Sequence, residues 1–189
     1  IYFPHIVQGP IGHYDKLLPQ FKELPGMRLK EVSFGLQLML WGYFKKLVIA
    51  DRIAIFTGTI FGDVYGHPGW YLFLGILLSA VQLYADFSGC MDIVTGISEV
   101  YGIRLEKNFD HPFSSQSVAE FWRRWHITLG TWFRNYVYMP LSAAPWFIRI
   151  AGKIRKKFGK GAFKAFTTVV PLYVVWILTG LWHGTGLNY

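Results

Sequence analysis

Charged side chains are scarce in this sequence, and two long stretches have none at all. Only 16% of the 189 residues are charged, whereas about 25% is usual in soluble domains. No Asp, Glu, Lys or Arg occurs between Val64 and Ala85 or from Ala165 to Tyr189. A helix needs about 20 mostly apolar residues to span a bilayer, so both stretches are long enough. The sequence therefore predicts an integral membrane protein and excludes an intrinsically disordered chain.

Cysteine is nearly absent, and so are several familiar catalytic motifs. The single Cys90 excludes an intrachain disulfide and a cysteine-based metal site. The metalloprotease, P-loop, dinucleotide and G-x-S-x-G motifs do not occur, and we expect no bound metal or cofactor. The chain begins without Met or a signal-peptide pattern and stops inside an apolar run. We therefore expect residues 1–189 to be an internal segment of one domain in a longer protein.

Acidic residues are missing from the last part of the chain. Residues 121–189 contain ten Lys or Arg and no Asp or Glu, whereas residues 1–120 contain nine Lys or Arg and eleven Asp or Glu. Such a basic segment can bind nucleic acid, anionic lipid or an acidic substrate. Seven of the ten basic residues lie between Arg149 and Lys164, beside apolar segments. This pattern is typical of a cytoplasmic loop and disfavours nucleic-acid binding.

Apolar periodicity predicts an all-α fold. Residues 69–85 form the clearest membrane span, and a second span runs from Ala165 to about Trp182 with a kink at Pro171. Residues 1–25 contain many prolines and glycines, which predict a loop or an interfacial segment.

The segment from Val32 to Phe61 is apolar at helical spacing but contains Lys45–Lys46 and Asp51–Arg52. A straight membrane span would bury these charges at a large cost. We predict either two shorter helices, or a membrane helix that ends near Phe44 followed by an interfacial helix.

A polar stripe is predicted on a later aromatic helix. Ser117 and Glu120 fit a capping box, which predicts a helix from about Val118 to Met139 that ends before Pro140. At 100° per residue, one narrow face of this helix carries four residues: Arg123, His126, Gly130 and Arg134. This face is expected to line a bundle interior, a cavity or the lipid headgroups. A simpler interpretation is that the arginines meet lipid phosphates and His126 is merely hydrogen-bonded.

His183 is a second candidate reactive residue, because it follows an uncharged segment and is flanked by glycines in GLWHGTG. Histidine is the side chain best suited to proton transfer near neutral pH. One of the two histidines could take a proton from an attacking hydroxyl while the other orients it or stabilises an oxyanion. His183 could equally satisfy backbone groups at a helix end.

The other polar candidates are weaker. Asp86 is either a functional acid or the cap of a broken helix, and Asp92 and Glu99 share a face that could pair with Arg104. The remaining histidines lack ligand spacing and are expected to be structural or exposed: His5, His13, His67 and His111.

Six segments of the sequence resemble the membrane-bound O-acyltransferase family, and more closely its bacterial alginate O-acetylation branch. They are YFPHIVQGPI (2–11), FKKLVIADRIA (44–54), YADFSGCMDIVTGISEVYGI (84–103), NFDHPF (108–113), FWRRWHITLGTWFRNYVYMPL (121–141) and GLWHG (180–184). The resemblance implies a polytopic, all-helical transmembrane protein whose helices surround a central channel. It also implies that His183 is the catalytic histidine and that His126 is the second conserved histidine.

The implied reaction moves an acyl group, in this branch acetyl, onto a hydroxyl of an extracytoplasmic cell-surface polysaccharide. His183 would act as general base, and His126 would orient the hydroxyl or stabilise charge. The candidate substrate-binding residues are Arg123, Arg134, Trp182 and Asp86.

The resemblance also suggests the partners and the compartment. The co-substrate would be acetyl-CoA or a carrier-linked acyl group, and the acceptor could be reached through a partner acyltransferase. Membrane lipid would surround a multi-pass protein of the bacterial inner membrane. Two alternatives remain open: D-alanyl transfer to teichoic acid, and a non-enzymatic transporter or scaffold for an acyl or lipid-linked intermediate.

Overall fold

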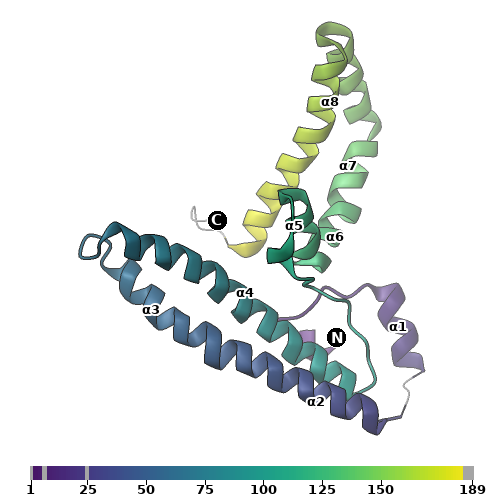
Figure 1. Ribbon diagram of the computed structural model, residues 1–189. Coiled ribbons are helices and arrows are strands. Elements are labelled where there is room, and N and C mark those ends of the chain that lie inside the picture. The colour runs from purple at the N-terminus through teal and green to yellow at the C-terminus, as the bar shows by residue number, and fades with distance from the viewer. Residues whose placement is uncertain (1, 6–7, 24–25, 185–189) are drawn as a thin grey trace. The chain divides into compact units, whose positions relative to one another are not determined.

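The computed structural model describes residues 2–5, 8–23 and 26–184, and all regular structure within these ranges is helical (Figure 1). This confirms the all-α class. The elements are η1 (Phe3–His5), α1 (Tyr14–Lys22), α2 (Leu29–Tyr43), η2 (Phe44–Ala50), α3 (Asp51–Gly62), α4 (Gly69–Val100), η3 (Pro112–Ser114), α5 (Val118–Arg124), α6 (Ile127–Phe133), η4 (Arg134–Tyr138), α7 (Met139–Ala143) and α8 (Pro145–His183). The chain divides into two compact units, Ile1–Thr128 and Leu129–Tyr189, which are described in turn.

Two long helical stretches dominate the first unit. α2, η2 and α3 form one continuous helical run over residues 29–62, and this run lies beside α4 (Figure 1). The predicted boundary near Phe44 is found, since α2 ends at Tyr43, but the predicted separation into two helices is wrong. The chain instead remains helical through η2, a π-helical segment whose wider turns accommodate an extra residue.

The prediction for the N-terminal region was also incomplete. Residues 14–22 form α1, with Pro19 inside the helix. The side chain of Gln20 exchanges two hydrogen bonds with the backbone of Arg104, and Lys16 forms an ion pair with Glu106. These contacts attach α1 to the segment that follows α4.

Two pairs of glycines bring the backbones of α2 and α4 into direct contact. A Cβ built on Gly35 would lie 2.5 Å from the carbonyl oxygen of Gly96, and one on Gly42 would lie 2.6 Å from that of Gly89. Gly35 and Gly42 are seven positions apart, as are Gly89 and Gly96, so the two pairs match in an antiparallel arrangement. Small residues at such crossings allow helices to pack closely. The sequence analysis did not anticipate this contact.

The two lysines among the charges that argued for a break are instead paired with acids on α4. Lys45 is 9% exposed, and its Nζ lies 2.7 Å from Oδ2 of Asp92 and donates to Oγ of Ser88 at 2.9 Å. Nζ of Lys46 lies 2.6 Å from Asp51 and 2.8 Å from Oδ1 of Asp86. Buried charges persist only when they are paired and hydrogen-bonded, and α4 meets this requirement for the buried Lys45.

These ion pairs correct two expectations about the acids of α4. α4 is unbroken from Gly69 to Val100, so Asp86 does not cap a broken helix. Asp92 pairs with Lys45 rather than with Arg104.

The second unit contains a helical hairpin. The chain passes through η4, α7 and the first part of α8, turns at Gly159, and returns along the rest of α8 (Figure 1). Gly159 has φ +85°, a conformation that glycine adopts readily. The rings of Phe147 and Phe166, on the two limbs, stack with centroids 5.1 Å apart. The predicted loop between Arg149 and Lys164 is thus helical on both sides of a single turn.

The interruption of α8 lies at Gly159, whereas Pro171, where a kink was predicted, is buried inside the helix. α4 and α8 are each long and apolar enough to cross a membrane. They contain the two spans predicted from the charge-free stretches.

Substituting Gly42 by Ala tests the close contact of α2 with α4. The added methyl group meets backbone atoms that cannot rotate away, so we expect a loss of at least about 2 kcal/mol of stability. Thermal unfolding of the full-length protein in detergent measures the change. Gly58→Ala is the matched control, because a Cβ at Gly58 meets nothing within 4 Å and Ala favours a helix by up to about 1 kcal/mol. Equal unfolding temperatures for the two variants would contradict the contact.

The pair of Lys45 and Asp92 is tested by removing one partner and then both. We expect Lys45→Met to cost roughly 2–3 kcal/mol, less than the 3–5 of a fully buried pair, because the side chain of Asp92 is 27% exposed. The double variant Lys45→Met/Asp92→Leu should recover most of this loss, since no charge is left unpaired. Arg52→Met, which changes an exposed cation of α3, should shift the stability by less than about 0.5 kcal/mol. Additive losses in the double variant would show that the two residues do not interact.

Candidate active site

The helix that was predicted to carry the polar stripe is broken at the stripe's own histidine. α5 ends at Arg124 and α6 begins at Ile127, and His126 has φ +47°. Left-handed backbone is uncommon outside glycine, although His is among the residues enriched there. The helix also does not end before Pro140, because α7 continues to Ala143 after the π-helical segment η4.

The break at His126 removes the basis of the predicted face. Arg123 lies in α5, whereas Gly130 lies in α6 and Arg134 begins η4. A rotation of 100° per residue cannot be carried across a left-handed residue, so these side chains do not form one helical stripe. The prediction of the stripe is wrong, although the start of the helix is correct.

The predicted capping box is confirmed at the start of α5. Oγ of Ser117 accepts a hydrogen bond from the backbone N–H of Glu120 at 3.2 Å. The carboxylate of Glu120 accepts one from the backbone N–H of Gln116 at 2.9 Å, and this bond lowers the pKa of Glu120 below its ordinary value. Glu120 is therefore ionised at neutral pH.

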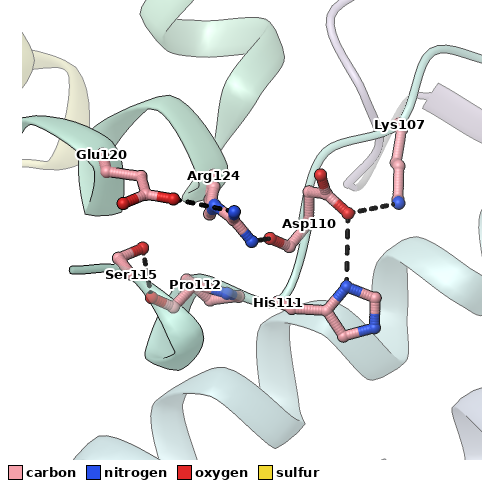
Figure 2. A network of polar contacts seen from close by, with 7 residues as sticks. All are labelled: Lys107, Asp110, His111, Pro112, Ser115, Glu120 and Arg124. Carbon is pink, nitrogen blue, oxygen red and sulfur yellow. Dashed lines mark hydrogen bonds and ion pairs between the residues drawn. The ribbon is translucent and has the colours of Figure 1, made fainter.

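Figure 2 shows the polar contacts that attach the preceding loop to α5. The guanidinium of Arg124 lies 2.7 Å from the carboxylate of Glu120 and donates to the carbonyl oxygen of Asp110 at 3.3 Å. The carboxylate of Asp110 pairs with Lys107 at 2.6 Å and with Nδ1 of His111 at 3.3 Å. The hydrogen bond from Lys107 lowers the pKa of Asp110. Arg124 thus helps to attach the loop at Asp110 to α5.

Asn108 is the buried centre of the segment around His126. Asn108 is only 3% exposed. Its Oδ1 accepts hydrogen bonds from the backbone N–H of Thr128 at 3.1 Å and from the hydroxyl of Thr128 at 2.9 Å. Nδ1 of His126 lies 3.2 Å from the same oxygen. The backbone carbonyl of Asn108 accepts from the N–H of Ile127 at 2.9 Å, so one residue holds both sides of the break.

Aromatic side chains pack this segment against α4. The ring of His126 meets Phe87 edge to face with centroids 4.7 Å apart. A cluster of aromatic residues continues the contact: Tyr84, Phe87, Phe109, Phe113, Phe121 and Trp125. Edge-to-face pairs add roughly 0.5–1.5 kcal/mol each beyond burial. The half-buried His126 is therefore fixed by both polar and aromatic contacts.

The other predicted site residues lie in different surroundings. Arg123 and Arg134 are exposed, and Asp86 is ion-paired with Lys46. Trp182 packs beside Trp132 with centroids 6.4 Å apart. His183 is the exposed last residue of α8. His126 and Asp86 belong to the first unit, and His183 and Trp182 to the second.

Asn108 was missed as a site residue by the sequence analysis, as was Thr128. The signal was an amide in a loop that is otherwise rich in aromatic and apolar residues, NFDHPF. Its burial and its three donors depend on a segment 18–20 positions further on, which spacing alone does not reveal. Among the described residues, no group of three or more His, Cys, Asp or Glu could hold a metal ion.

These observations describe a helical protein with apolar helices of membrane-spanning length and a histidine fixed at a helix break. The chain belongs to the membrane-bound O-acyltransferase family, whose sequence model matches residues 1–151. The matched range includes His126.

Similar proteins extend the likeness to nearly the whole chain. A protein of Pseudomonas putida named probable alginate O-acetylase AlgI is 35% identical over 99% of this chain and 35% of its own length. A peptidoglycan O-acetyltransferase of Helicobacter pylori is 33% identical over 100% of this chain and 33% of its own. A teichoic acid D-alanyltransferase of Bacillus subtilis is 26% identical over 100% of this chain and 46% of its own. The chain spans about one third of the length of the O-acetyl-transferring relatives.

The left-handed backbone of His126 can be tested apart from its ring. His126→Gly and His126→Ala both remove the imidazole, but only glycine adopts φ +47° without strain. We expect the glycine variant to be more stable than the alanine variant by about 1 kcal/mol. Thermal unfolding of both full-length variants checks this. An alanine variant at least as stable as the glycine variant would contradict the left-handed conformation.

Proposed function

We propose that the full-length protein is a membrane-bound O-acyltransferase that moves an acetyl group onto a hydroxyl of a cell-surface polysaccharide. The observation that carries this proposal is the likeness, over nearly the whole chain, to proteins named for O-acetylation of two different polysaccharides, alginate and peptidoglycan. The lower identity to a teichoic acid D-alanyltransferase makes D-alanyl transfer the second candidate.

The proposed reaction needs one base, one oriented hydroxyl and an activated acyl donor. His183 takes the proton of the acceptor hydroxyl as its oxygen attacks the acyl carbonyl. The bond from the carbonyl carbon to the donor's leaving group then breaks, and the leaving group receives the proton from His183. The donor is acetyl-CoA or a carrier-linked acyl group. His126 assists by orienting the hydroxyl or by stabilising the charge on the carbonyl oxygen.

Four further side chains are proposed to bind the substrates. Arg123 and Arg134 are exposed cations suited to an anionic donor or acceptor. Trp182 and Asp86 are proposed as further substrate contacts, with Asp86 already held by Lys46.

The proposed setting is the inner membrane of a bacterium, crossed several times by helices around a channel. The basic hairpin around Gly159 would face the cytoplasm, as the excess of Lys and Arg suggests. The polysaccharide would lie on the opposite side of the membrane and could receive the acyl group through a partner acyltransferase.

The proposal is tested by His183→Ala in the full-length protein, expressed in a strain that lacks its own copy. We expect the acetate released from the surface polymer by mild alkali to fall to background. His126→Ala should reduce it roughly 10²- to 10⁴-fold in rate, the usual contribution of a proton-transfer residue. His67→Ala is the control, since His67 lies in the turn between α3 and α4 and contacts the backbone of Asp63.

Three results would separate the alternatives. Release of D-alanine rather than acetate from the same hydrolysate would favour transfer to teichoic acid. Normal acetylation by a stably expressed His183→Ala variant would show that His183 is not the base. If His126→Ala also left acetylation unchanged, a transporter or scaffold would be the better description.

A further inference from the structure

The contacts of the Asn108 side chain determine which end of its amide is oxygen. The atom nearest Thr128 lies 3.1 Å from the backbone N–H of that residue, and a backbone N–H can only donate. The opposite end lies 3.1 Å from the sulfur of Met91, and a thioether can only accept. The NH₂ group therefore faces Met91, and the oxygen faces Thr128 and His126.

This orientation determines which nitrogen of His126 carries the proton. A carbonyl oxygen has no hydrogen to give, so the contact of 3.2 Å with Nδ1 of His126 is a hydrogen bond only when Nδ1 is protonated. The oxygen receives three donors, and the bond from His126 is the longest of them. In the neutral ring Nε2 then has no proton and is an acceptor.

We propose that Asn108 is a positioning residue that fixes His126 in the Nδ1-protonated form. This inference rests on the proposed function and decides between the two roles left open for His126. A neutral ring with its proton on Nδ1 has nothing to donate from Nε2. In its neutral form His126 can therefore serve the acceptor hydroxyl only as a hydrogen-bond acceptor at Nε2, and it cannot donate to an oxyanion.

The surroundings are built to hold this ring in one orientation. The hydroxyl of Thr128 accepts from the backbone N–H of Ile11 at 3.0 Å, which leaves its own hydrogen for Oδ1 of Asn108. The edge-to-face contact with Phe87 restricts rotation of the His126 ring. An amide that is itself held by two groups of Thr128 cannot turn to offer its NH₂ group to His126 without breaking both bonds.

The inference is tested by nitrogen NMR of the full-length protein in lipid nanodiscs with ¹⁵N-labelled histidine. The signals of His126 are identified by their loss in His126→Gln, and spectra are recorded at a pH where the ring is neutral. We expect a proton on Nδ1 in the wild type and its loss or redistribution in Asn108→Leu. A wild-type ring with its proton on Nε2 would overturn the inference.

Two variants separate positioning from general structural support. Thr128→Val also removes a hydrogen bond to Asn108, but it leaves the acceptor of His126 in place, so the Nδ1-protonated form should persist. Asn108→Asp keeps an acceptor oxygen beside Nδ1 and should keep that form even if Asn108→Leu fails to fold. Loss of the Nδ1 proton in Asn108→Asp, or an unchanged ring in a folded Asn108→Leu, would contradict the assignment.

Kinetics supply the second measurement. We expect Asn108→Leu to lower kcat roughly 10- to 100-fold, as small misplacements of reacting groups do, and to change KM for the acyl donor by less than about twofold. A rise in KM with unchanged kcat would contradict a role in orienting the hydroxyl. The NMR result tests Asn108, whereas the acetylation assay of His183→Ala tests the proposed function, so the two can fail separately.

Discussion

The direct contact between the backbones of α2 and α4 is the constraint on which the first unit depends. Helices approach this closely only where side chains are missing, and here Gly35 and Gly42 face Gly96 and Gly89. The short separation also brings Lys45 within reach of Asp92 on the partner helix. The close packing of the glycines and the ion pair of Lys45 with Asp92 thus lie along the same line of contact between α2 and α4.

The position of α4 in turn fixes the surroundings of His126. Phe87 and Met91 are four residues apart and so share one face of α4. The first meets the ring of His126, and the second accepts a hydrogen bond from Asn108. The site is therefore assembled against a rigid helix rather than within a loop, although its histidine lies at a break between two short helices.

Local signals in the sequence predicted the features that depend on neighbouring residues. The start of α5 followed from Ser117 and Glu120, and both apolar spans followed from the missing charges. The break at His126 could not be predicted, because neither Trp125 nor His126 is a helix breaker and the hydrogen bonds that hold the break come from Asn108, 18 positions earlier. The continuous helical run through Lys45 could not be predicted for the same reason, since Asp92, the acid that pairs with Lys45, lies on another helix.

The turn at Gly159 has a consequence for how the second unit tolerates insertions and deletions. The two limbs of the hairpin run back along each other. Trp182, near the end of α8, therefore lies beside Trp132 of α6, which precedes the first limb. One residue added to either limb would shift that limb by about 1.5 Å and rotate it by about 100°. A change in the length of one limb must therefore be matched in the other, whereas residues added at the turn itself leave both limbs in register.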